Sequence, residues 1–582
     1  MFDLKVTAGT IVDGTGSDPF VGDVGITDGV IVAVRPGGGL EGVAAETIDA
    51  AGLLVTPGFV DVHTHYDGQV TWDEVLDPST GHGVTTLVMG NCGVGFAPVQ
   101  AGREQWLINL MEGVEDIPGT ALNEGIRWDW ESFPQYLDAL DQRRLSVDVG
   151  AQVAHGAVRA YAMGERGARN EPATASDIAV MARIVQEAIE AGALGFSTSR
   201  TLGHRAMDGE PVPGTFAAED ELFGLGRAMA AGGRATFELA PAGAAGEDLV
   251  APKREVDWMC RLAEEIGMPV SFALLQVSGA PTMWRELMDE SLRATERGAP
   301  VFPQVAGRPF GMLIGWQTHH AFAKRPTYRA LAGRLPFDEL VTELARPPVR
   351  RAILAEADLP PDPAVLFDSM NRMVQGSIER LYVLGDPPDY EPTADRTVSA
   401  LARADGMEPF AKLYDLLLEQ QGRALLMLPF FNFADGNHDA IRDMLTHPAG
   451  VSGLSDGGAH CGLICDASIP TFLLTHWARD RSRGERLPLA YVVKKQTHDT
   501  AALYGLDDRG VIRTGKKGDL NVIDFSRLRL HTPRVANDLP AGGRRLLQAA
   551  DGYVATVVSG QVTRRHGRDT GARPGRLVRG AR

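Results

Sequence analysis

Two histidines separated by one residue, His63 and His65, are the residues of this sequence best placed for metal chemistry. They end the apolar run GFVDV (58–62), which follows a proline and is typical of a buried strand. Alternate side chains of a strand point the same way, so both imidazoles would face one ion. An arbitrary H-x-H pair is more often two structural core histidines. The apolar strand and its Pro-Gly entrance favour the metal interpretation here.

Cys92 and Asp456 also follow apolar runs. Cys92 lies in GNCGV (90–94), where small neighbours would let its thiolate face a metal; the alternative is a small buried hydrophobe. Asp456 follows VSGLS (451–455) and precedes two glycines. We expect its carboxylate to hold an ion or its water and to carry a proton to a leaving nitrogen. The alternative is a helix-capping or turn aspartate.

His460 lies four residues after Asp456 and is a candidate to polarise a substrate carbonyl or to bind a substrate carboxylate, with a structural histidine as the alternative. Cys461 and Cys465 follow it and could indicate a second metal site. The apolar residues between the two cysteines favour packing instead.

Five further residues are candidates to bind substrate. His155 ends the run VAH (153–155), Glu238 lies in the run ATFEL (235–239), and Gln276 ends the run FALLQ (272–276). Each could line a pocket or be an ordinary polar group at a strand end. Arg200 and Arg308 could pair with a substrate carboxylate through their guanidinium groups, although a structural salt bridge is the more common role.

The elements that must position these residues alternate between short apolar runs and helical stretches, as in the run 176–191, which begins with a serine N-cap. This alternation and the length of 582 residues favour a (β/α)8 barrel over 57–505, whose strands would present the site at their carboxyl ends. A stretch of prolines and polar helices predicts a helical insertion at about 305–400. Residues 1–56 and 506–582 carry strand and hairpin patterns, and we expect them to form one small β-sandwich.

The net charge of the chain argues against some classes of binding partner. A net charge of −18 argues against nucleic acid and against an anionic membrane. The first residues lack a charged segment followed by an apolar one, so we expect no secretory signal and a cytoplasmic protein. A small-molecule substrate is the partner that the candidate site implies, and a homo-oligomer remains open.

Several of these segments together resemble a known family. The segment GFVDVHTH (58–65) is similar to the first-strand metal motif of the amidohydrolase superfamily, and GNCGV, GALGFST (192–198) and LSDG (454–457) resemble its D-aminoacylase branch. The run from RGVI (509–512) to DLNV (519–522) resembles the return of that superfamily into its β-sandwich. The resemblance implies a TIM-like barrel, Cys92 as a metal ligand, Asp456 as the catalytic aspartate and an N-acyl-D-amino-acid deacylase activity.

One departure from that branch changes the expected site. Its fifth and sixth strands each supply a metal histidine, whereas the corresponding runs here hold Glu238 and Gln276. We therefore predict one divalent ion, Zn²⁺ with Mn²⁺ or Fe²⁺ as alternatives, held by His63, His65 and Asp456 with Cys92 in reach. The expected reaction is hydrolysis of an amide C–N bond. Hydrolysis of a cyclic amide, lactone or other small carbonyl compound is the runner-up, and an inactive, metal-poor binding protein is the rival.

Overall fold

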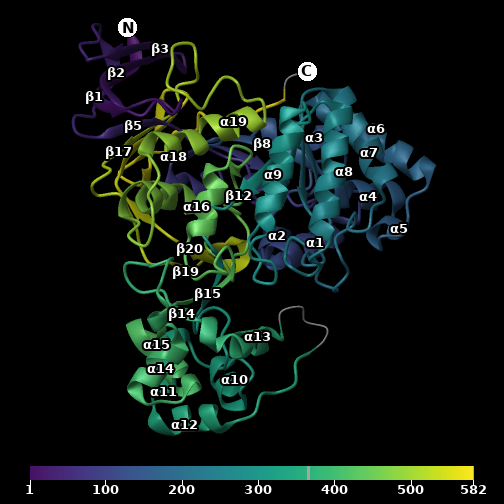
Figure 1. The fold of residues 1–582 in the computed structure, drawn as a ribbon, viewed down its shortest axis with the longest axis vertical. Helices are drawn as coiled ribbons and strands as arrows, with labels where there is room; N and C mark the ends of the chain where they lie inside the picture. The colour runs from purple at the N-terminus through teal and green to yellow at the C-terminus, as the bar shows by residue number, and fades with distance from the viewer. Residues whose placement is uncertain (363–367, 581–582) are drawn as a thin grey trace.

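The computed structural model describes residues 1–362 and 368–580 (Figure 1). Its centre is a closed barrel of eight parallel strands. The first and last strands meet where the His65 N–H donates to the Gly457 carbonyl (2.8 Å) and the Asp456 N–H donates to the His63 carbonyl (3.1 Å). The predicted (β/α)8 barrel is confirmed. Its strands are β6 (Phe59–Asp61), β7 (Val84–Met89), β8 (Asp148–Ala154), β9 (Gly195–Ser199), β10 (Thr236–Ala240), β11 (Val270–Leu274), β12 (Val301–Val305) and β16 (Val451–Ser452).

Helices surround the barrel because their apolar faces pack on its strands. In α6 (Ala175–Ala191) the N-cap is Thr174, not the predicted Ser176, since Thr174 and Asp177 form a capping box. The other helices of this layer include α1 (Glu104–Glu115), α2 (Gly119–Gly125), α3 (Phe133–Asp141), α4 (His155–Met163), α7 (Glu219–Gly232), α8 (Ala251–Ile266), α9 (Met283–Glu296), α16 (Asp439–Thr446), α17 (Ile469–Phe472), the π-helix η5 (Leu473–Asp480), α18 (Leu489–Lys495) and α19 (His498–Leu503).

The two ends of the chain contribute to one nine-stranded sheet, because β17 pairs with β5 on one side and with β22 on the other. Asp28 and Gly29 both have positive φ between β2 and β3, as a type I′ turn requires. Apolar residues from both ends fill a shared core. The strands are β1 (Phe2–Ile11), β2 (Phe20–Thr27), β3 (Val30–Pro36), β4 (Ala44–Asp49), β5 (Leu54–Pro57), β17 (Leu520–Ile523), β22 (Tyr553–Val558), β23 (Gln561–Arg565) and β24 (Arg568–Asp569).

A helical subdomain is inserted between β12 and β16 and projects away from the barrel at the bottom of Figure 1. It runs further along the chain than the predicted 305–400, because Leu413, Tyr414 and Leu417 of its last helix complete a separate core. Its elements are α10 (Pro326–Ala332), α11 (Phe337–Leu344), α12 (Pro347–Ala355), α13 (Met370–Gly376), α14 (Val398–Asp405), α15 (Pro409–Gly422) and a small sheet of β13 (Phe310–Ile314), β14 (Tyr382–Val383) and β15 (Leu426–Phe431).

No helix in the described parts of the chain combines the length and the apolar character that crossing a bilayer requires.

Candidate metal centre

Turns at the carboxyl ends of β6, β7 and β16 position the predicted metal ligands. His63 and His65 follow β6, and Cys92 follows β7 in a turn where its own φ is 55°. Gly90 is required in that turn, because its φ is 83° and a Cβ there would lie 2.3 Å from the Gln152 carbonyl oxygen. Asp456 follows β16 with a φ of 49°, a conformation that aspartate tolerates better than most residues.

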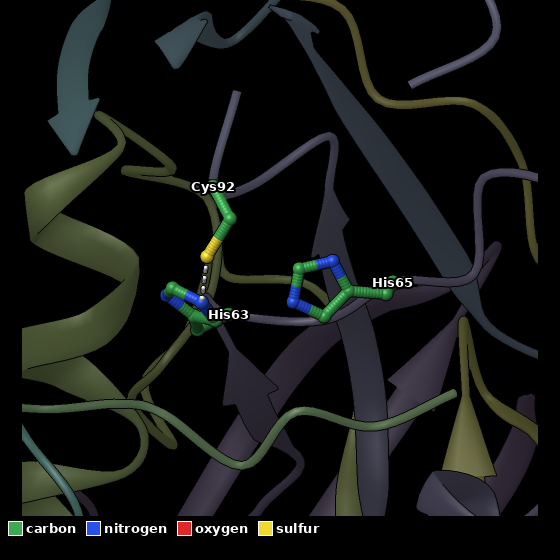
Figure 2. Close-up of side chains that lie close together, drawn as sticks. All are labelled: His63, His65 and Cys92. Carbon is green, nitrogen blue, oxygen red and sulfur yellow. Dashed lines mark hydrogen bonds between the residues drawn. The ribbon is translucent and has the colours of Figure 1, made fainter. Parts of the chain in front are cut away.

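His63, His65 and Cys92 converge on one point, as Figure 2 shows. One ligand atom from each lies within 4.8 Å of the others, and all three side chains are buried. The Cys92 Sγ lies 3.4 Å from the His63 Nε2. A tetrahedral zinc ion with ordinary Zn–N and Zn–S bonds would hold such a pair about 3.5 Å apart. The spacing therefore suits a shared divalent ion.

Asp456 completes this group from the opposite side of the barrel seam. Its Oδ1 lies 3.4 Å from the His63 Nε2 and 3.8 Å from the His65 Nε2. Burial alone would raise the pKa of Asp456, but the neighbouring His65, His63 and His460 imidazoles hold the pKa below its ordinary value. The carboxylate is therefore ionised and able to act as a ligand or a base.

The protonation states of His63, His65 and Cys92 are compatible with binding a metal cation. Burial lowers the pKa of His63 to about 4 and also lowers the pKa of His65, so both imidazoles are neutral and keep a lone pair for a metal. Burial, followed by the Glu115 and Glu238 carboxyl groups, raises the pKa of the Cys92 thiol. A bound cation would oppose this rise and favour the thiolate that metals require.

Three further polar residues surround the cluster. Gln304 and Glu115 were not identified from the sequence, and Glu238 was predicted to bind substrate. Gln304 of β12 lies with its Oε1 2.8 Å from the His63 Nδ1 and so orients that ring. The Glu115 Oε1 lies 3.4 Å from the His65 Nδ1, and Glu238 lies 3.7 Å from the His63 Nδ1. Burial raises the pKa of Glu115, and it raises that of Glu238 to about 8.

Buried polar atoms without a hydrogen-bond partner gather here. They are both ring nitrogens of His65, the Glu115 Oε1 and the Glu238 Oε1. Such orphans are costly unless an ion or a ligand satisfies them. A divalent metal ion bound here would satisfy the unpaired His65 nitrogen that faces the cluster, so the residues present fit such an ion.

A cavity of about 300 Å³ opens above the cluster. Barrel residues form its floor, and the inserted subdomain supplies much of its apolar wall through Phe310 and Met312 of β13 and Phe430 and Phe431 of β15. His460 lines it with Nε2 3.8 Å from the Asp456 Oδ2, close enough to act on the same substrate. No lysine or arginine is found among the described residues that line this cavity.

His204 also lines the cavity and was missed because it lies in the loop after β9, where no strand pattern marks it. Its Nδ1 lies 3.0 Å from the Ser199 Oγ. Burial, followed by the charge of His460, lowers the pKa of His204 to about 3, so it is a neutral hydrogen-bonding group. Glu115 carried no signal either, because it ends α1 rather than a barrel strand.

The two predicted carboxylate-binding arginines do not line the cavity. Arg200 donates from Nε to the Glu255 carboxylate (2.7 Å) and from Nη1 to the Ala217 carbonyl. Arg308 is buried against Asp466, with an Nη2–Oδ1 distance of 2.7 Å, and its guanidinium lies over the Tyr390 ring. Arg308 is buried and needs such a partner, and Arg200 is also paired within the protein, as in the structural alternative.

His155, Glu238 and Gln276 also lie outside the cavity lining. His155 is buried between Glu221 (Nε2–Oε1, 2.9 Å) and Thr198. Glu238 lies beneath the cluster, where its Oε2 accepts the Cys92 N–H (3.1 Å). Gln276 lies beyond the end of β11 and donates to Asp435 (2.7 Å). Their expected contact with substrate is therefore replaced by contacts within the protein.

Cys461 and Cys465 are both buried in the main core. Packing, which the sequence favoured over a second metal site, describes these two cysteines.

Comparisons with known proteins identify the family of the chain. A model described as "Amidohydrolase family" matches residues 46–564. An uncharacterized protein of Mycobacterium tuberculosis is 27% identical over 602 residues, covering 97% of this chain and 92% of the relative. A D-aminoacylase of Alcaligenes xylosoxydans xylosoxydans is 30% identical over 313 residues, which is 53% of this chain and 58% of that protein. The crystal structure of an N-acyl-D-glutamate deacylase from Bordetella bronchiseptica, complexed with zinc and a phosphonate inhibitor, has a TM-score of 0.62 at 23% identity, with 99% of each chain covered.

Proposed function

The chain belongs to the amidohydrolase family and is a metal-dependent hydrolase of carbon–nitrogen bonds other than peptide bonds, and we propose that it removes an apolar acyl group from a small N-acyl amine. The observation that carries this proposal is the convergence of His63, His65, Cys92 and Asp456 beneath a largely apolar cavity. N-acyl-D-amino acids are the first substrate class to test, because a 30% identical relative is a D-aminoacylase.

The proposed metal site uses His63, His65 and Asp456, with Cys92 as the fourth group in reach. When bound, a divalent ion supplies Lewis-acid activation of water and of the substrate carbonyl. Zinc suits this mixture of nitrogen, sulfur and oxygen donors, with Mn²⁺ or Fe²⁺ as alternatives. Removal by a chelator followed by restoration with each ion in turn would identify it.

Asp456 is the proposed proton carrier. Its Oδ1 faces the two histidines, while its Oδ2 faces His460 and the cavity side. Because the low pKa of Asp456 leaves it ionised, it can accept the proton of the attacking water. The same carboxyl then returns the proton to the leaving nitrogen. His460 would donate a hydrogen bond to the oxygen on which negative charge develops.

A second candidate substrate is a neutral amide or cyclic amide without a carboxylate. The supporting observation is that no lysine or arginine lies among the described residues of the cavity lining. Burial lowers the pKa of both His204 and His460, so neither offers a full positive charge at neutral pH. A substrate carboxylate would then have to be stabilised by hydrogen bonds or by the metal alone.

A matched set of three amides tests both candidates. N-acyl-D-leucine, N-acyl-L-leucine and the N-acyl derivative of isopentylamine carry the same acyl group and differ only in stereochemistry or in the carboxylate. We expect hydrolysis by the metal-loaded protein and none after chelation. Faster cleavage of the D-leucine compound supports the first class, and faster cleavage of the isopentylamide supports the second. If the metal-loaded protein cleaves none of a broad amide panel, the proposed activity is wrong and a binding role replaces it.

A further inference from the structure

A second group of potential metal ligands lies outside the barrel mouth. Glu391 follows β14 of the inserted subdomain, His438 is the residue before α16, and His476 lies within η5. One ligand atom from each lies within 4.8 Å of the others. Glu391 and His438 are buried, and the His476 side chain is 15% exposed. The three residues therefore come from three elements that the fold brings together behind the seventh and eighth strands.

The distances between the ligand atoms suit a single small ion. The His438 Nδ1 lies 3.1 Å from the His476 Nε2, which lies 3.3 Å from the Glu391 Oε2. The third side of the triangle, from the His438 Nδ1 to the Glu391 Oε2, is 3.8 Å. Nitrogen and oxygen ligands of tetrahedral zinc are about 3.3 Å apart at ordinary bond lengths. Three protein ligands would leave one position open on the side where His476 reaches solvent.

The hydrogen bonds around the triangle orient its ligands. The His438 Nε2 lies 2.8 Å from the Tyr390 carbonyl oxygen, which can only accept, so the proton is on Nε2 and the Nδ1 lone pair faces the triangle. A carbonyl on the far nitrogen is the usual support of a metal-binding histidine. His476 is held by stacking on Phe472, with ring centroids 4.6 Å apart and an interplanar angle of 13°.

The carboxylate of Glu391 is also fixed. Its Oε1 accepts hydrogen bonds from the backbone N–H of His438 (2.7 Å) and from the Arg481 Nη2 (3.1 Å). Its Oε2 accepts from the Arg481 Nε (3.2 Å) and faces both histidine rings. Asp439 binds the same guanidinium at 2.7 Å and offsets part of its positive charge. Because Oε2 has a second lone pair, an ion could share this oxygen with Arg481.

The backbone at His476 is unusual as well. Residues 473–480 form a π-helix, a rare conformation that often marks functional positions. His476 of this π-helix and Phe472, the last residue of α17, both contact the His438 ring. The convergence of the three residues therefore includes one that lies on this π-helix.

We propose that Glu391, His438 and His476 form a second divalent-metal site of the zinc type, separate from the barrel site, that ties the inserted subdomain to the helices after β12 and β16. The metal-free alternative is a shared hydrogen bond in which the His476 Nε2–H donates to the His438 Nδ1 and to Glu391. The two alternatives differ in one countable quantity, the number of ions that the folded chain retains.

The experiment counts metal in the full-length protein. The wild type and His476→Gln are stripped with a chelator, reloaded with zinc, freed of unbound metal and measured by elemental analysis. The glutamine can still donate a hydrogen bond from the position of Nε2, but it is a poor ligand for zinc. His498→Gln is the matched control, because His498 lies on α19 with a 48% exposed side chain and pairs only with Asp499 among the interactions observed. We expect His476→Gln to lose one ion per chain and His498→Gln to lose none.

Cobalt reloading separates the two sites. Only the barrel site contains a cysteine, so its sulfur-to-cobalt charge-transfer band should be unchanged in His476→Gln, while part of the visible absorption disappears. The metal-dependent rise in Tm should also fall, whereas Tm in chelator should match that of the wild type. Equal metal content in His476→Gln and the wild type would overturn the proposal.

A complementary variant does not depend on the folding of His476→Gln. His63→Ala removes a ligand of the barrel site and leaves the second group intact. It should retain one zinc ion per chain, without the sulfur charge-transfer band after cobalt reloading. If His63→Ala binds no ion at all, the second site does not exist, irrespective of which substrate the barrel site cleaves.

Discussion

At the scale of single residues, burial sets the protonation of the barrel site. It lowers the pKa of the His63 and His65 imidazoles and raises the pKa of Glu115 and Glu238, so these groups tend to be neutral. Asp456 is the exception, since its pKa is lowered by the surrounding histidines. One ionised carboxylate beside neutral nitrogen ligands is the arrangement that a metal-activated hydrolysis needs.

The first prediction concerns Asp456→Asn. The amide is nearly isosteric with the carboxylate but cannot accept a proton from water, so turnover should fall by about 10²–10⁴-fold. His63→Ala should lower both turnover and the metal held by the barrel site, because it removes a ligand. Turnover on the best amide and metal content per chain are measured together for both variants. If Asp456→Asn kept near-normal turnover with metal bound, His460, which lines the cavity, would replace it as the candidate proton carrier.

At the level of secondary-structure elements, a buried network of ionisable side chains joins α4 to α7 beside the barrel. Glu221 of α7 accepts from His155 (2.9 Å) and from the Arg159 Nε of α4 (2.7 Å), and all three side chains are buried. Burial alone would raise the pKa of Glu221, but the bond from His155 and the charge of Arg159 lower it to about 2. His155 thus joins Glu221 of α7 to Thr198 of β9 and lies outside the cavity lining.

The second prediction is that Glu221→Gln destabilises the protein. It leaves the buried Arg159 charge without its counter-ion, which costs about 3 kcal/mol of the free energy of unfolding. Glu171→Gln is the matched control, since its partner Arg166 is exposed and such pairs contribute less than about 1 kcal/mol. Urea unfolding at neutral pH, or Tm where unfolding is irreversible, measures both. Equal effects of the two substitutions would contradict the assigned role of the buried network.

At the scale of the whole molecule, the cavity belongs to two bodies. The barrel supplies the candidate metal ligands, and β13 and β15 of the inserted subdomain supply the aromatic wall. Met312 and Phe430 of this wall pack in the subdomain's own core, so that part of the wall can vary without disturbing the barrel, whereas Phe310 and Phe431 pack on the main core. Substrate choice and metal binding should therefore respond to different substitutions.

The third prediction tests this separation with Phe431→Ala. Loss of an aromatic contact with an apolar acyl chain should lower kcat/KM by about 10-fold or more for long acyl groups, with a smaller effect on acetyl substrates. The metal content of the barrel site should not change. Phe216→Ala is the control, because that ring is 61% exposed and does not line the cavity. A parallel loss of metal in Phe431→Ala would show that the two bodies are not independent.

Features that depend on neighbours along the chain could be predicted from the sequence alone. The alternation of apolar runs and helices predicted the barrel, because strand and helix periodicities are local. The same locality predicted that His63 and His65 would share a direction, and the structure has both rings on one cluster. The Asp28-Gly29 turn follows from the same kind of argument, since both residues tolerate a positive φ.

Contacts between residues far apart in the chain could not be predicted in this way and are known from the folded structure. Barrel closure brings Gln304 to His63 across 241 positions, and the end of α1 brings Glu115 to His65, although neither residue lies in a recognisable motif. Arg308 was predicted to bind a substrate carboxylate, but it pairs with the buried Asp466, a partner that the sequence does not reveal. Burial and partner choice arise when the chain closes on itself, and a linear pattern does not carry that information. The triangle of Glu391, His438 and His476 has the same origin, since no spacing in the sequence predicts it.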